Sequence, residues 1–176
     1  MRLKRALTAA LLASCLLATT AAAAAADQVI FLVRHAERAD APGAPPLPPG
    51  TPANDPPLSA AGNERAKKLA ALLASADVRH IFTSELERAR QTAAPLADKV
   101  KIKAVTVSAG KPEALIEQVG KSSGNVLIVG HTNTVPELIK RLGVKTPISI
   151  PESEFDNLFV VVHPTSGEPT LIRLRY

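Results

Sequence analysis

Short apolar runs alternate with amphipathic stretches along most of the chain. The runs at residues 29–33 and 126–129 are continuously apolar and β-branched, which is typical of strands buried on both faces of a sheet. Lys101 and Lys103 alternate with apolar neighbours, which predicts a half-buried strand nearer the sheet edge. In all, strands are expected at residues 29–33, 78–82, 100–107, 126–129, 158–162 and 170–174.

Helical periodicity fills the intervals between most of these runs. Ser59 is a favourable N-cap for a helix that extends to about Ser75 with its leucines facing inward, and Gly143 is placed to close a later helix. The other helices are expected at residues 85–98, 112–120 and 134–142. Strands that alternate with helices predict an α/β fold, a three-layer α/β/α sandwich with a mostly parallel central sheet.

The first 26 residues have the pattern of a secretory signal peptide. Basic residues at positions 2, 4 and 5 precede an apolar run over residues 6–17, and alanines at 21–26 offer a cleavage site before Asp27. Residues 27–176 would then form the single mature domain. The alternative, a transmembrane anchor, is disfavoured because the run is short and interrupted by polar residues.

Cys15 leaves a second interpretation of the leader open. Residues 12–15, Leu-Ala-Ser-Cys, are similar to a bacterial lipobox, so Cys15 could carry a lipid anchor. The apolar run continues past Cys15, which favours cleavage, an exported, periplasmic product and no membrane span after cleavage. Such a product has no cysteine and must be stabilised by core packing without disulfides.

Charge and aromatic content argue against a nucleic-acid partner. The formal net charge is +5, but removing residues 1–26 leaves 18 Lys and Arg against 16 Asp and Glu, a net of +2. Four Phe and one Tyr provide little surface on which bases could stack. The isoelectric point therefore reflects the leader more than a basic binding face.

A proline-rich segment at residues 41–57 separates the first strand from the first helix. It holds eight prolines and two glycines, so no regular element is expected there. Loops of this length inside a domain are commonly functional, and this one is a candidate border of the cleft.

Polar pairs follow three of the predicted strands. In open α/β sheets the ligand site lies beyond the carboxyl ends of the strands, so these pairs are expected to meet in one cleft. They are Arg34–His35, Thr83–Ser84 and Gly130–His131.

These residue types suit phosphoryl transfer. The guanidinium forks of Arg34 and Arg88 are able to grip phosphate oxygens bidentately, and a neutral imidazole is a competent nucleophile. Ser84 is a candidate phosphate ligand, although capping of the following helix is the favoured role. Arg38 and Arg90 are expected to be surface charges.

Four segments resemble, in order, the motifs of the histidine phosphatase superfamily, also called phosphoglycerate mutase-like. Residues 34–37 (R-H-A-E) resemble its R-H-G or R-H-A signature, and residues 55–62 its D-x-x-L-S-x-x-G segment. Residues 83–93 resemble T-S-x-L-x-R-A-x-Q-T-A, and residues 129–131 contain the late G-H motif. Four motifs together are far more specific than any one.

The resemblance implies a phosphoglycerate mutase-like fold with His35 as the nucleophile. It implies Arg34, Arg88 and His131 as the rest of the phosphate pocket, with no metal and no organic cofactor. The family usually adds a carboxylate that protonates the leaving oxygen. The candidates for this acid are Glu37, ranked first because it lies beside His35, then Asp55 and Glu113.

The function predicted from the sequence is therefore hydrolysis of a phosphomonoester or phosphoramidate through a phosphohistidine on His35. The expected partner is a phosphorylated small molecule or a phosphorylated envelope component. Two alternatives stay open: an inactive or weakly active phosphate-binding protein of the same fold, and a phosphatase of phosphohistidine on proteins. A mutase is disfavoured, because export would separate it from cytosolic sugar phosphates.

Overall fold

A computed structural model describes residues 27–41 and 44–176, in which one six-stranded sheet forms the centre. The strand order is β3-β2-β4-β1-β5-β6. Neighbours among β3, β2, β4 and β1 pair in parallel, whereas β5 is antiparallel to both β1 and β6. The strands are β1 (Gln28–Arg34), β2 (Val78–Thr83), β3 (Val105–Thr106), β4 (Asn125–Gly130), β5 (Asn157–His163) and β6 (Thr170–Arg175).

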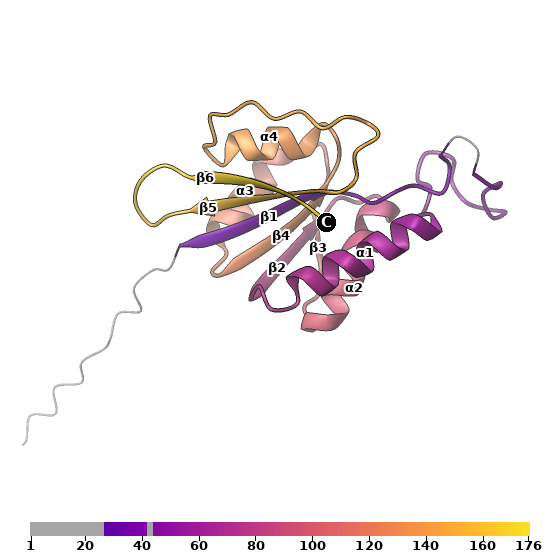
Figure 1. Cartoon of the computed structure of the whole chain (residues 1–176), viewed down its shortest axis with the longest axis horizontal. Coiled ribbons are helices and arrows are strands. Elements are labelled where there is room, and N and C mark those ends of the chain that lie inside the picture. Colours follow the sequence, from indigo (N-terminus) through magenta and orange to yellow (C-terminus); the bar gives the residue numbers. More distant parts are fainter. Residues whose placement is uncertain (1–26, 42–43) are drawn as a thin grey trace, which may run out of the picture.

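Helices cover both faces of this sheet, as Figure 1 shows. One face packs against α1 and α2, and the other against α3 and α4. The predicted three-layer α/β/α architecture is thus confirmed. The sheet is mixed: the strands β3, β2, β4 and β1 are parallel, and β5 and β6 complete it. The helices are α1 (Ala60–Leu73), α2 (Glu87–Val100), α3 (Pro112–Lys121) and α4 (Thr134–Arg141).

The central strand β1 explains why its sequence is apolar without alternation. Ile30 and Leu32 pack into the core beneath α3 and α4, whereas Phe31 and Val33 pack on the opposite face with α1 and α2. All four side chains are buried, each contributing about 1.5–3 kcal/mol of hydrophobic stabilisation. Strand β1 therefore lies fixed between two cores and delivers its last residue to the sheet's carboxyl edge.

The strand predicted at residues 100–107 is largely wrong. Helix α2 continues to Val100, and Lys101 ends it in the left-handed conformation, so β3 retains only two residues. The apolar positions that suggested a strand, including Ile102 and Ala104, instead pack against the core shared by α1 and α2. Alternation here reflects the packing of a helix end and the following loop.

The proline-rich segment forms no helix or strand over its described residues 44–57. In Figure 1 it extends beyond the end of α1, and residues 49–57 lie beside Glu87, Arg90 and Gln91 of α2. The expectation that it borders the cleft is therefore not met by these residues.

The predicted signal peptide and the possible lipid attachment at Cys15 fall in residues 1–26, outside the described part of the chain. Among the helices of residues 27–41 and 44–176, none is long and apolar enough to cross a membrane.

Candidate active site

An open cleft of about 580 Å³ lies beyond the carboxyl ends of β1, β2 and β4. The structure brings all four sequence-predicted phosphate-pocket residues together on its walls. The lining consists of Arg34, His35, Arg38, Leu86, Arg88, Ala109, Gly110, His131, Thr132, Asn133, Thr134 and Glu152.

His35 is held in one orientation at the end of β1. Its backbone N–H donates to Gly130 O at 2.9 Å, and its side chain is buried, with 3% exposed. Its Nδ1 lies 2.8 Å from Ala36 O; because a carbonyl only accepts, Nδ1 must donate the proton. Nε2 is therefore left with the lone pair that a nucleophile requires.

Burial and positive neighbours keep His35 neutral. Loss of solvation is the largest effect, and electrostatic interactions with His131, Arg88 and Arg34 add to it, so that the pKa of His35 is lowered to about 3. The imidazole is consequently uncharged over the whole neutral range, which is the form able to attack phosphorus.

His131 lies beside His35, with their ring centroids 5.3 Å apart. Its Nε2 shares a 2.8 Å hydrogen bond with Ser84 Oγ, while burial and then the charge of Arg88 lower the pKa of His131 to about 4. Its backbone N–H donates to Thr134 Oγ1 at 2.8 Å. A Cβ on Gly130 would stand 2.8 Å from that same Oγ1, so the glycine lets the strand end approach α4 closely.

Arg88 presents N–H groups that the described residues leave unpaired. Its Nε and Nη1 are buried without a hydrogen-bond partner among these residues, and Asp55 Oδ1 is 3.7 Å from Nη1. Burial lowers the pKa of Arg88, but an arginine side chain in a protein remains charged at neutral pH. A buried, charged donor of this kind is suited to receive an anion.

Arg34 is engaged very differently. Its Nη1 donates to the carbonyl oxygens of Pro151, Glu152 and Glu154 at 2.8–3.2 Å, and its Nη2 binds Glu152 Oε2 at 2.7 Å. The guanidinium carbon also lies 4.1 Å from the centre of the Phe155 ring. Of the guanidinium nitrogens of Arg34, only Nε has no partner among the described residues. The predicted bidentate hydrogen bonding to phosphate is therefore reduced to the one N–H group that is free.

Arg38 lines the cleft, which the sequence interpretation did not foresee. Its guanidinium pairs with Asp40 through both Nε and Nη2, and Asp40 is two residues further along. The only feature of the sequence that distinguishes Arg38 is its place shortly after the R-H motif. Its charge alone does not distinguish it from Arg90, which forms a surface ion pair with Glu87.

The remaining motif residues hold the pocket segments to one another. Thr92 Oγ1 accepts from Ala36 N at 2.9 Å, and Gln91 Oε1 accepts from Leu58 N at 2.7 Å. Ser59 caps α1 as predicted, accepting from Gly62 N at 3.0 Å. A Cβ on Gly62 would lie 2.3 Å from Glu37 O, so this glycine permits α1 to pack against the chain that follows His35.

None of the three predicted acids reaches the cleft wall. Glu37, ranked first, is turned to Arg65, whose Nη2 and Nε bind its carboxylate at 2.6–3.0 Å. Asp55 accepts from Glu87 N at 2.7 Å and so caps the start of α2. Glu113 is exposed and pairs with Arg141 at 2.8 Å. The tentative ranking of Glu37 first is therefore not supported, because its carboxylate is bound by Arg65 and does not line the cleft.

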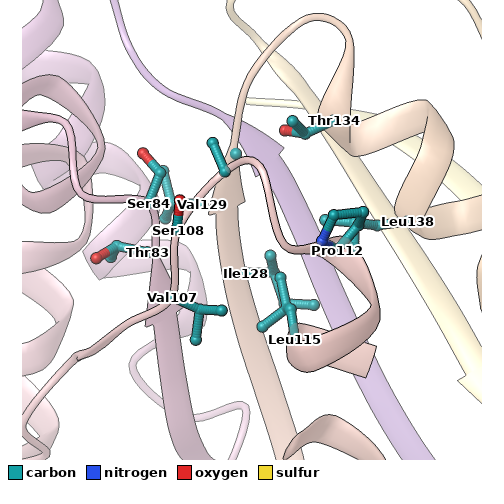
Figure 2. A pocket seen from close by; sticks show the side chains of 12 residues that line it. Thr83, Ser84, Val107, Ser108, Pro112, Leu115, Ile128, Val129, Thr134 and Leu138 are labelled. Carbon is teal, nitrogen blue, oxygen red and sulfur yellow. The ribbon is translucent and has the colours of Figure 1, made fainter. Parts of the chain in front are cut away.

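Ser84 lies behind His131 and lines a small cavity rather than the cleft, and it is not the residue that caps α2. Helix α2 starts at Glu87, whose N–H donates to Asp55, whereas Ser84 Oγ is hydrogen-bonded to His131 at 2.8 Å and accepts from Leu86 N at 3.4 Å. Behind Ser84 is a cavity of about 20 Å³, with Val107, Leu115 and Ile128 around it (Figure 2). This volume holds about one water molecule, so a substrate must lie on the cleft side of Ser84.

Known proteins resemble this chain in part of its sequence and in its fold. The model of the histidine phosphatase superfamily (branch 1) matches residues 30–110, which include the motifs of β1, α1 and α2. Over these residues the chain is similar to the histidine phosphatase superfamily. No curated protein matches the sequence.

Solved structures share the fold at low sequence identity. The putative alpha-ribazole-5'-P phosphatase from Escherichia coli K-12 superposes with a TM-score of 0.65 at 19% identity, covering 85% of this chain and 96% of its own. The protein histidine phosphatase SixA complexed with tungstate gives 0.63 at 19%, covering 84% and 96%. The putative phosphohistidine phosphatase SixA from Agrobacterium tumefaciens gives 0.58 at 22%, covering 84% and 98%.

Proposed function

We propose that this protein is a phosphatase that hydrolyses a phosphomonoester or phosphoramidate through a covalent phosphohistidine on His35. The proposal rests on the presence of a nucleophile and an anion-binding group in the same cleft. His35 is neutral with its proton fixed on Nδ1, and Arg88 offers buried N–H donors to an anion in the same cleft. The match of residues 30–110 to the model of a phosphatase superfamily supports the same conclusion.

The reaction follows from these positions in two displacements. Nε2 of His35 attacks phosphorus in line, the bond to the leaving oxygen or nitrogen breaks, and that atom takes up a proton. Water then attacks the phosphohistidine, which restores His35 and releases phosphate. Arg88, His131 and the free Nε of Arg34 donate to the non-bridging oxygens and stabilise the charge of both transition states.

The proposed substrate is a phosphorylated small molecule or a phosphorylated component of the cell envelope. Residues 44–57 do not line the cleft, so the described part of the chain leaves room around the phosphate for varied leaving groups. The same openness favours a second candidate, phosphohistidine on a protein surface, which is the activity named for one of the similar structures.

Two further elements of the proposal concern the setting of the enzyme. We propose that residues 1–26 direct export of the protein. Mass spectrometry of the mature N-terminus distinguishes cleavage before Asp27 from lipidation at Cys15.

We also propose that hydrolysis needs no metal. Activity that is retained in excess EDTA would support this, and activity that is restored only by added divalent ions would contradict it.

The experiment that tests the function is a comparison of His35→Ala with His80→Ala. His80 lies on β2 and hydrogen-bonds Ser123 O at 3.1 Å, away from the cleft, so it is a matched control. Hydrolysis of 4-nitrophenyl phosphate should fall by at least about 10⁴-fold in His35→Ala and stay within twofold of wild type in His80→Ala. Unchanged turnover in His35→Ala would refute the proposal.

A further inference from the structure

The carboxylate that faces the cleft is not one that the motifs suggest. Of the residues that line the cleft, within the described ranges, Glu152 is the only one with a carboxylate. It lies on the segment that leads into β5, beyond residues 30–110 that the family model matches. Its side chain is 80% exposed, so it faces the solvent side of the pocket where a leaving group would lie.

Other carboxylates near the rim are already committed to protein groups. Glu85 accepts from Ala109 N at 2.8 Å, a bond that lowers the pKa of Glu85 and favours its charged form. Asp40 is held by the guanidinium of Arg38, which lowers the pKa of Asp40. Both are therefore poor proton donors near neutral pH.

The backbone of the Glu152 segment is held independently of the Glu152 carboxylate. Three carbonyl oxygens, those of Pro151, Glu152 and Glu154, accept from Arg34 Nη1, and Phe155 packs against the same guanidinium. The carboxylate adds one contact, 2.7 Å from Arg34 Nη2, at an exposed position. The carboxylate can therefore leave Arg34 without releasing the segment.

Building on the proposed phosphatase activity, we propose that Glu152 is the general acid that protonates the leaving atom and then the base that accepts a proton from the attacking water. An arriving phosphate is an anion that competes for Arg34 Nη2, and it replaces the carboxylate there. The carboxyl group that is released lies on the solvent side of the pocket, where the leaving atom departs.

The proton balance closes over the two displacements. In the first, His35 Nε2 forms a bond to phosphorus, the bond to the leaving oxygen breaks, and that oxygen takes the proton of the Glu152 carboxyl group. In the second, water attacks phosphorus and the bond to Nε2 breaks, while the water's proton passes to the Glu152 carboxylate. The acid is thereby regenerated without any other reactant.

The test is the dependence of rate on the leaving group in Glu152→Gln. 4-Nitrophenolate leaves without protonation, whereas an alkoxide such as that of glycerol phosphate needs a proton as the bond breaks. Loss of a general acid should therefore lower kcat for the alkyl phosphate by about 10²–10³-fold and for 4-nitrophenyl phosphate by less than tenfold. Glu154→Gln is the matched control, because Glu154 is on the same segment but pairs with Arg173 and Arg175.

Three results would overturn the assignment of Glu152. The first is an equal loss of kcat on both substrates, and the second is no loss of kcat on either. The third is a lower KM with unchanged or raised kcat on both substrates, which would mean that Glu152 only competes with phosphate for Arg34. The proposed function is judged separately: if the wild type hydrolyses both substrates and His35→Ala neither, it stands whatever Glu152→Gln shows. If the wild type hydrolyses neither, the function fails and the role of Glu152 with it.

Discussion

The two arginines of the cleft have opposite surroundings. Arg88 comes from the first turns of α2, and its buried Nε and Nη1 find no partner among the described residues. Arg34 comes from the end of β1, and the segment 151–155 takes up Nη1, Nη2 and one face of its guanidinium. One arginine is prepared for an anion, whereas the other already binds its own chain.

Within one cleft, Arg88 is therefore suited to bind a ligand, whereas Arg34 supports the structure of the protein. A charged side chain whose buried N–H groups make no hydrogen bond reduces stability, and those groups become useful when a ligand arrives. A charge that already binds several carbonyl groups stabilises the fold and has fewer N–H groups left for the ligand. The sequence motifs list the two arginines together, but their replacement should have different consequences.

The largest effect is expected for Arg88→Ala on catalysis. Removing its donors should lower kcat/KM for 4-nitrophenyl phosphate by about 10²–10³-fold, since these N–H groups stabilise charge on the transferring phosphoryl group. The free energy of unfolding should change by less than about 1 kcal/mol, because no hydrogen bond from its Nε or Nη1 is lost. Steady-state kinetics and urea unfolding measure the two quantities, with Arg90→Ala as the surface control on the same helix. A large loss of stability without a loss of rate would reverse the comparison.

Arg34→Ala should mainly lower stability. It leaves the carbonyls of Pro151, Glu152 and Glu154 without their donor, and the free energy of unfolding should fall by about 3 kcal/mol. Glu152→Gln keeps these carbonyl contacts and should lose less than about 1 kcal/mol, as expected of an exposed ion pair. Equal stability of Arg34→Ala and wild type in urea would contradict the structural role of Arg34.

A smaller effect is expected from the buried histidines of the cleft at acid pH. The pKa of His35 is about 3 and that of His131 about 4 in the folded protein, against about 6.5 when unfolded. The unfolded chain therefore binds more protons below pH 6.5, and stability is lost as the pH falls from there towards 4. Each histidine should account for about 2 kcal/mol between pH 7 and pH 5.

His35→Gln tests this linkage directly. The difference between its unfolding free energies at pH 7 and pH 5 should be about 2 kcal/mol smaller than that of the wild type. His80→Gln serves as a control that should keep the wild-type difference, since His80 lies outside the cleft. Parallel pH profiles for all three proteins would mean that burial does not hold His35 neutral.

Much of the fold and the four residues of the phosphate pocket were predictable because they depend on local patterns. Apolar runs identified β1 and β4, and the motifs after them placed His35 and His131 at the sheet edge where they do meet. The short β3 was not predictable, because the same alternation arises when the end of α2 and its loop pack against the core.

The unpredicted features depend on contacts between distant parts of the chain. Glu37 was the natural acid by sequence position, but its direction is set by Arg65 on α1, and Asp55 is used to cap α2. Glu152 reaches the cleft only because its segment binds Arg34, 118 residues earlier in the chain. No motif marks that contact, so its chemistry could not be inferred from spacing.

The most direct test of the account is to trap the phosphoenzyme. Enzyme mixed with excess 4-nitrophenyl phosphate, quenched in base and digested, should give a peptide whose phosphate is on His35, with the label stable in base and lost in acid. His131→Asn should slow turnover while still allowing the label on His35. Turnover by the wild type with no base-stable label, or a label on another residue, would contradict His35 as the nucleophile.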